Sequence, residues 1–173
     1  MKRLALVSFK RPLTAYNGDN LRVQRQDSAG TLKQIWDGLR VLEETDQSNV
    51  VQALYTLSPG TYGDVVSQRR SGVGSYFHFD PLGSTTRLTN GSQNVTDTYL
   101  YKAFGDILLA GTTMNPFEFV GREGYYYDSN AGLYLLSHRY LSPVVGRFLV
   151  WDMAWPKAGE WNQYVYASAR PTV

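Results

Sequence analysis

The sequence contains no cysteine, which excludes disulfides, thiol nucleophiles and cysteine-ligated zinc. Its two histidines, His78 and His138, have no carboxylate at the spacing of a zinc motif. No G-x-S-x-G motif and no phosphate-cradling glycine loop occurs either. We therefore expect no metal site and no cofactor.

Charge is also sparse. Asp, Glu, Lys and Arg make up 18% of the chain, and the formal net charge is +2 with both signs interspersed. A nucleic-acid-binding surface needs a clustered basic face, so we expect no nucleic-acid partner. The pair Arg69-Arg70 is interpreted as part of a solvated loop.

Long apolar runs are missing, since no run approaches the roughly 20 residues that cross a bilayer. We therefore expect no membrane span. The opening residues, MKRLALVSF, are basic and then briefly apolar, but Lys10 and Arg11 follow too early for a signal peptide. An opening β-strand is the better interpretation.

Aromatic residues and glycines are plentiful: 13 tyrosines and 16 glycines. They recur as a small cell, in which an aromatic residue is followed by a polar turn residue and then by glycine. Asx side chains and glycines favour tight turns. Cells 19 to 26 residues apart are typical of a repeat array. They begin at Tyr16, Trp36, Tyr55 (a degenerate copy), Phe79, Tyr101 and Tyr127.

Residues between the turns alternate as in half-buried strands. Phe77 and Phe79 would share one face of a strand, and Tyr76 and His78 the other. The segment Phe117–Phe119 repeats this alternation and predicts a further strand.

Turn signals complete the prediction of the fold. Asn90-Gly91, between two strand-like segments, is a hairpin signal. Residues 33–44 have the best helical pattern, but Gly38 favours a hairpin there. We predict an all-β fold, a repeat array of antiparallel β-hairpins that forms a curved sheet of about 14 strands.

The block YYYDSNAGLYLLSHRYLSPVVGRFLVWD, followed by EWNQYVY, resembles the Rhs/YD-repeat proteins. The resemblance is to their C-terminal part with the repeat-associated core, at residues 76–173, and residues 1–75 resemble the YD-repeat hairpins that continue into it. Both parts would form one continuous unit, an arc of an Rhs-type β-shell. The matching residues are Tyr127, Asp128, Gly132, Leu133, Tyr134, Arg139, Tyr140, Pro143, Gly146, Arg147, Phe148, Asn162, Tyr164 and Tyr166.

The resemblance implies a structural role. In bacterial polymorphic toxins and toxin complexes such shells enclose and help to deliver a C-terminal toxin, and a related shell supports adhesion in teneurins. Expected partners are the remainder of a shell or a second copy through the sheet edges, and a C-terminal toxin. The expected location is secreted or at the cell surface, as part of a larger protein. Alternatives are an aspartyl self-cleaving core, and an adhesion or carbohydrate-binding module.

Asp152 is the one candidate catalytic residue, because many family members cleave themselves through paired aspartates. Such chemistry needs two carboxyl groups that share a proton. The second aspartate belongs to a family segment that the 173 residues do not include, so we expect no enzyme activity. Asp128 is predicted to be a turn residue. Arg139 and Arg147 are predicted to bind carboxylates or backbone carbonyls inside the block.

Overall fold

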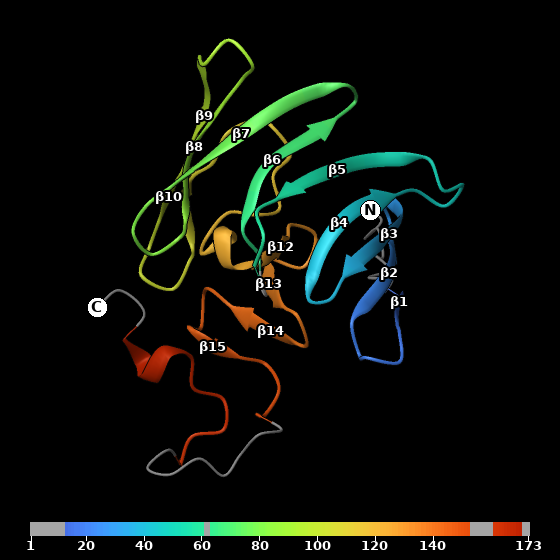
Figure 1. Ribbon diagram of the computed structural model, residues 1–173. Coiled ribbons are helices and arrows are strands. Elements are labelled where there is room, and N and C mark those ends of the chain that lie inside the picture. The colour runs from blue at the N-terminus through green and yellow to red at the C-terminus, as the bar shows by residue number, and fades with distance from the viewer. Residues whose placement is uncertain (1–12, 61–62, 153–160, 171–173) are drawn as a thin grey trace, which may run out of the picture.

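The computed structural model describes residues 13–60, 63–152 and 161–170 (Figure 1). The predicted opening strand lies outside these ranges. The described residues form strands, two short 3₁₀ turns (Gly121–Glu123 and Ala167–Ala169) and irregular connections. No helix in these ranges is long and apolar enough to cross a membrane.

The main element is an open antiparallel sheet of nine strands in sequence order. Each strand pairs with the next along the chain, so β1 and β9 form the two edges. This arrangement confirms the predicted all-β array of hairpins. The strands are β1 (Leu13–Tyr16), β2 (Arg22–Asp27), β3 (Gly30–Asp37), β4 (Arg40–Thr45), β5 (Val51–Leu57), β6 (Val65–Arg70), β7 (Val73–Phe79), β8 (Thr85–Thr89) and β9 (Val95–Thr98).

Two smaller sheets follow. The first pairs two short strands, and the second is a meander of four. Figure 1 shows the nine-stranded sheet bending around β12 and β13 of the meander. The strands are β10 (Leu100–Tyr101) and β11 (Ile107–Leu109), then β12 (Tyr126–Asp128), β13 (Leu133–Leu136), β14 (Arg139–Ser142) and β15 (Arg147–Phe148).

One five-residue turn recurs between the strands of the large sheet. The side-chain oxygen of its first residue accepts backbone N–H groups two or four residues on, at 2.8 to 3.1 Å. Its fourth residue has a left-handed backbone, as Gln93 shows with φ of 64°. The hairpin predicted at Asn90-Gly91 is confirmed, although Gln93 and not Gly91 is the left-handed residue there. The turns begin at Asn17, Asp46, Asp80 and Asn90.

The predicted alternation holds on β7, where Phe77 is buried and its neighbours Tyr76 and His78 are exposed. The hairpin over residues 33–44 is also confirmed, as β3 and β4. The strand predicted at Phe117–Phe119 is wrong. These three residues are all buried in an irregular segment, because they run between the large sheet and the meander and are covered on both sides.

Two apolar clusters hold the sheets together. The larger joins β4 to β8 with Phe117, Tyr126 and Leu135, and therefore lies between the large sheet and the meander. The smaller contains Phe119, Tyr134, Leu141, Phe148 and Tyr166. The boundary between residues 1–75 and 76–173 falls inside β7, which runs from Val73 to Phe79. The division itself stays a prediction.

Candidate functional site: the polar core between the two sheets

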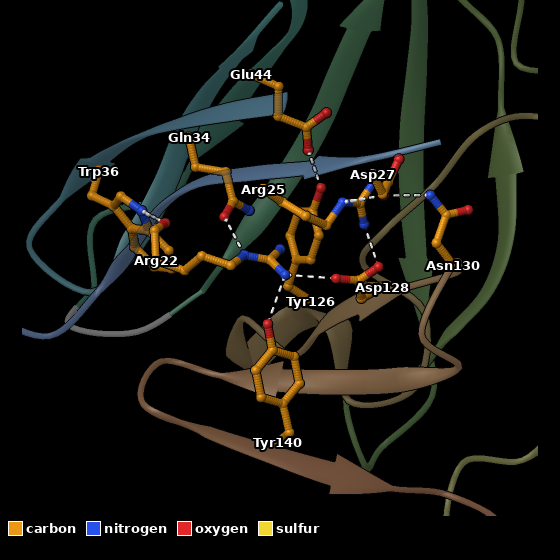
Figure 2. A network of polar contacts seen from close by, with 10 residues as sticks. All are labelled: Arg22, Arg25, Asp27, Gln34, Trp36, Glu44, Tyr126, Asp128, Asn130 and Tyr140. Atoms are coloured by element: carbon orange, nitrogen blue, oxygen red, sulfur yellow. Dashed lines mark hydrogen bonds and ion pairs between the residues drawn. The ribbon is translucent and has the colours of Figure 1, made fainter. Parts of the chain in front are cut away.

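A network of charged and hydroxyl groups lies within this contact between the sheets, and Figure 2 shows most of its members. Its centre is Arg22, the first residue of β2, whose side chain is fully buried. Arg22 Nη1 donates to Asp128 Oδ2 at 2.6 Å and to the Tyr140 hydroxyl at 2.8 Å. Its Nε donates to Gln34 Oε1 at 3.0 Å. Arg22 therefore joins the repeat sheet to both β12 and β14.

Asp128, at the end of β12, is bound by a second arginine. Its Oδ1 accepts from Arg25 Nη1, and Arg25 Nε forms an ion pair with Asp27 at 2.9 Å. Asn130 closes this side of the network, because its amide donates to Asp27 Oδ2 at 2.7 Å. The carboxylate of Asp128 is thus shared by two arginines of one strand, which lie three residues apart.

Glu44, near the end of β4, is the second buried carboxylate. Its Oε1 accepts hydroxyl groups from Tyr55 and Tyr126, each at 2.7 Å, and its Oε2 accepts from Arg70 at 2.9 Å. Burial, and next the charge of Glu44, raise the pKa of both tyrosines well above their usual value. Both hydroxyls therefore stay protonated and remain donors.

The buried charges balance. The three arginines Arg22, Arg25 and Arg70 face three carboxylates, and each carboxylate is bound by at least one arginine. Buried ions cost several kcal/mol each unless they are paired and hydrogen-bonded. The counter-ions of Arg22 and Arg25 at Asp128 come together only when the two sheets are assembled. The arrangement therefore binds one sheet to the other, and its carboxylates are all occupied by hydrogen-bond donors.

Several motif residues belong instead to the smaller apolar cluster. Tyr134 is fully buried, and its hydroxyl donates to the backbone carbonyl of Gly105 at 2.9 Å. Its ring lies 4.8 Å from that of Tyr127. Phe148 packs edge-on against Tyr166 at 5.7 Å. These residues supply the apolar contacts of the meander.

Others build its turns. Gly132 and Gly146 have φ of 65° and 69°, a backbone region that favours glycine. Leu133, directly after the first turn, pairs with Asp128 across the β12–β13 hairpin. Pro143 is buried at the start of the second turn. The predicted turn role of Asp128 is incomplete: its carbonyl accepts two turn N–H groups, whereas its carboxylate belongs to the buried network.

Asp152 lies outside that network. It forms an ion pair with Arg139 at 3.1 Å, and its backbone N–H donates to Gln163 at 3.0 Å. Arg139 also lies over the ring of Phe148, 3.7 Å from its centroid. Asp152 and Asp128 are therefore held by different arginines. The structure does not bring the two together as a catalytic pair.

The remaining motif residues lie at the end of the meander. Arg147 is exposed, and its backbone bridges to Val165. Asn162 accepts the N–H of Tyr164 at 3.0 Å through its side chain, and the Tyr164 carbonyl accepts the N–H of Phe148 at 3.0 Å. These bonds attach residues 161–166 to β15.

The histidines serve separate local contacts. His78 lies on the exposed face of β7 beside the Thr89 hydroxyl, at 3.0 Å, and His138 beside the carbonyl of Asp19, also at 3.0 Å. No group of three potential ligands for a metal ion occurs in the described parts of the chain. The interpretation of Arg70 as a solvated loop residue is wrong, because β6 extends to it and points its side chain at Glu44.

Sequence reasoning missed Arg22 and Glu44 as members of this network and assigned Arg70 to a loop. In the sequence, such a residue would be recognised as a charged residue at an inward-facing position of an alternating strand. The inward positions are hard to assign here, because bulges between Glu44 and Thr45 and between Ile35 and Trp36 shift the alternation.

Known proteins resemble the chain in sequence and in fold. The tRNA3(Ser)-specific nuclease WapA of Bacillus spizizenii is 28% identical over 94% of this chain. The double-stranded DNA deaminase toxin A of Burkholderia cenocepacia is 29% identical over 80% of it. Among solved structures, the Tc holotoxin pore of Photorhabdus luminescens matches with a TM-score of 0.69 and 18% identity over 93% of the chain. The predicted resemblance to Rhs proteins is confirmed, because these relatives and solved structures are of the Rhs type.

The chain is short beside these relatives. It spans 7% of WapA, 11% of the deaminase toxin and 8% of the holotoxin chain. The TcdB2–TccC3 crystal structure agrees, with a TM-score of 0.69 and 18% identity over 92% of this chain and 9% of that one. No family model matches the chain.

Proposed function

We propose that the chain is a structural segment of an Rhs-type β-shell, which within a longer protein encloses and helps to deliver a C-terminal toxin. The observation that carries this proposal is the open nine-stranded sheet in sequence order. Its edge strand β1 has every residue exposed, and on the other edge, β9, only Asp97 is buried. Such edges accept further strands by backbone hydrogen bonding, and an array that grows at both ends builds a wall.

The meander also contributes to the proposed role. It covers the concave face of the large sheet and is held there by the balanced network around Arg22 and Glu44. A segment fixed in this way closes off one part of the wall's inner face. The chain would therefore supply both wall and closure. The names of the sequence relatives, a nuclease and a deaminase toxin, support the association of such segments with toxins.

A segment exchange in WapA tests the proposal. The stretch of Bacillus spizizenii WapA that matches this chain is replaced by this chain, and the product is digested with increasing amounts of protease. If the chain serves as wall, the remainder of WapA keeps the protection it has in the parent. The measurement is the map of cleavage sites by mass spectrometry.

Two controls make the result specific. A chimera that carries a shuffled version of the 173 residues should be cleaved throughout. A chimera with Asp128→Asn should open new sites, because the meander loses its central ion pairs. Protection no better than that of the shuffled chimera would exclude a wall role.

A further inference from the structure

A hollow of about 680 Å³ opens beside the polar network. Its walls are the β2–β3 hairpin, the ends of β4 and β6, and the irregular segment that leads from β11 to Glu118. Tyr126 and Tyr127 of β12 form the remaining side. The hollow thus lies where the large sheet, the meander and the connecting segment meet, and part of the polar network lines it.

The charges on its walls are unequal. Arg25 and Arg70 supply two positive groups, against four carboxylates. Three of the carboxylates have partners: Asp27 pairs with Arg25, Glu44 with Arg70, and Asp46 binds backbone N–H groups of its own turn. The fourth is Glu118.

Glu118 is 6% exposed, and its Oε2 is buried with no hydrogen-bond partner in the described parts of the chain. Its backbone is fixed, since its carbonyl accepts N–H groups from Thr85 at 2.9 Å and Gly121 at 3.1 Å. Burial raises the pKa of its carboxyl to about 7. A buried acceptor without a donor is destabilising, and more so when it is charged. The Glu118 Oε2 atom on this wall therefore lacks a hydrogen-bond donor among the described residues.

Apolar atoms accompany this carboxyl. Leu32, Ile107, Ala110, Met114 and Pro116 also line the hollow. An apolar wall beside an acid without a partner matches a long aliphatic stem that carries a cation. A compact inorganic cation would leave the apolar wall without a contact, and an anion would meet the excess of carboxylates.

We propose that this hollow binds the side chain of a lysine or arginine presented by another polypeptide segment, with its cation paired to Glu118. The stem would lie along the apolar wall, and the ammonium or guanidinium group would pair with the Glu118 carboxylate. The binding of a lysine or arginine side chain in the hollow does not depend on a surrounding shell. The binding test can therefore fail while the proposed wall role holds, and the wall role can fail while the binding test succeeds.

The isolated lysine side chain tests the site directly. Isotope-labelled protein, at a pH above the pKa of Glu118, is titrated with Nα-acetyl-lysine amide while the Glu118 carboxyl carbon and the wall amides are followed by NMR. We expect saturable shifts confined to the hollow, with a dissociation constant on the order of 1 mM. Nα-acetyl-norleucine amide has a comparable aliphatic stem without the ammonium group, and should bind at least about tenfold more weakly.

Two matched variants complete the experiment. Glu118→Gln removes the charge and keeps the shape, and should weaken lysine-amide binding about tenfold or more. Glu43→Gln makes the same change on β4, at a position in register with the exposed Ile35 and Leu54, and should bind as wild type. Absence of saturable shifts in the wild type, equal binding of the norleucine compound, or unchanged binding by Glu118→Gln would each overturn the proposal.

Discussion

Asp128 accepts a hydrogen bond from Arg22 at 2.6 Å although 106 positions of the sequence separate the two residues. Both are buried, so neither finds a substitute in solvent. The bond joins the second strand of the large sheet to the first strand of the meander. Neither sheet can bury its half of the pair alone, and we expect the two sheets to fold as one cooperative unit.

Asp128→Asn should be strongly destabilising. The change keeps the size of the side chain but leaves Arg22 and Arg25 without their shared counter-charge. Breaking a buried ion pair from one side costs about 3–5 kcal/mol. Urea denaturation followed by circular dichroism should show a drop of that size in the free energy of unfolding.

The matched control is Asp37→Asn, which also breaks an ion pair with an arginine, Arg40. Asp37 is 53% exposed, so its loss should cost only about 0–1 kcal/mol. Equal losses in the two variants would mean that burial does not set the strength of the Arg22–Asp128 pair.

Two neighbouring glutamates offer a test of the second half of the network. Glu44→Gln leaves Arg70 without its counter-ion and alters the acceptor shared by Tyr55 and Tyr126. We expect a loss of about 2–4 kcal/mol, within the range for groups in buried networks. Glu43→Gln, on the opposite face, should change the free energy of unfolding by less than about 0.5 kcal/mol. Comparable losses in thermal or chemical unfolding would show that the assigned faces of β4 are wrong.

The sequence was sufficient for the fold class because local chemistry repeats along it. Asx residues at the head of each turn and alternating strands between them predict hairpins without reference to distant residues, and Asn90 and Phe77 behave accordingly. The segment Phe117–Phe119 has the same alternation, yet it is no strand. Its neighbours come from two different sheets. The local alternation of residues does not reveal that a segment is covered by a sheet on each side.

The polar core could not be derived in the same way. Asp128 has the pattern of a turn residue, and its carbonyl does serve the turn. The partners of its carboxylate lie more than 100 positions upstream. Which of Glu43 and Glu44 faces inward depends on a bulge that alternation alone does not predict. Long-range pairing and bulges, rather than composition, decide which charges are buried.

Glu118 gives the protein a specific pH dependence. Burial raises the pKa of its carboxyl in the folded state from 4.5 to about 7. An acid whose pKa is higher in the folded state than in the unfolded state stabilises the folded state fully below pH 4.5. This stabilisation is lost as the pH rises through about 7. This contribution should reach about 3 kcal/mol at most.

The measurement is the free energy of unfolding of wild type minus that of Glu118→Gln across this pH range. Subtraction removes other carboxyls such as Asp97. Burial raises the pKa of Asp97, but hydrogen bonds from Thr113 and its neighbours lower it overall, so its own contribution has the opposite sign. A difference that does not change with pH would contradict the buried, unpaired state of Glu118.

Gly146 and Gly132 should differ in their tolerance of alanine. Both have φ near the left-handed region, at 69° and 65°, so both substitutions should cost about 1–2 kcal/mol for the backbone. A Cβ atom at Gly146 would lie 3.0 Å from the ring of Phe104, whereas one at Gly132 would meet nothing within 4 Å. Gly146→Ala should therefore lose about 1–3 kcal/mol more. Equal melting temperatures of the two variants would argue against the contact with Phe104.

The isolated chain should associate with itself through the edges of the large sheet. Leu13 on β1 is 70% exposed and Val95 on β9 is 54% exposed. Among the described residues no further strand pairs with the outer edge of either strand, so both edges can accept another strand. Sedimentation velocity at rising concentration should show dimers and larger species.

Val95→Lys places a charge on the β9 edge, and charged edges resist strand pairing, so this variant should shift the distribution toward monomer. Val144→Lys adds the same charge at an exposed position outside the large sheet and should leave the distribution unchanged. A monodisperse monomer of the wild type at high concentration would show that these edges do not accept a second copy.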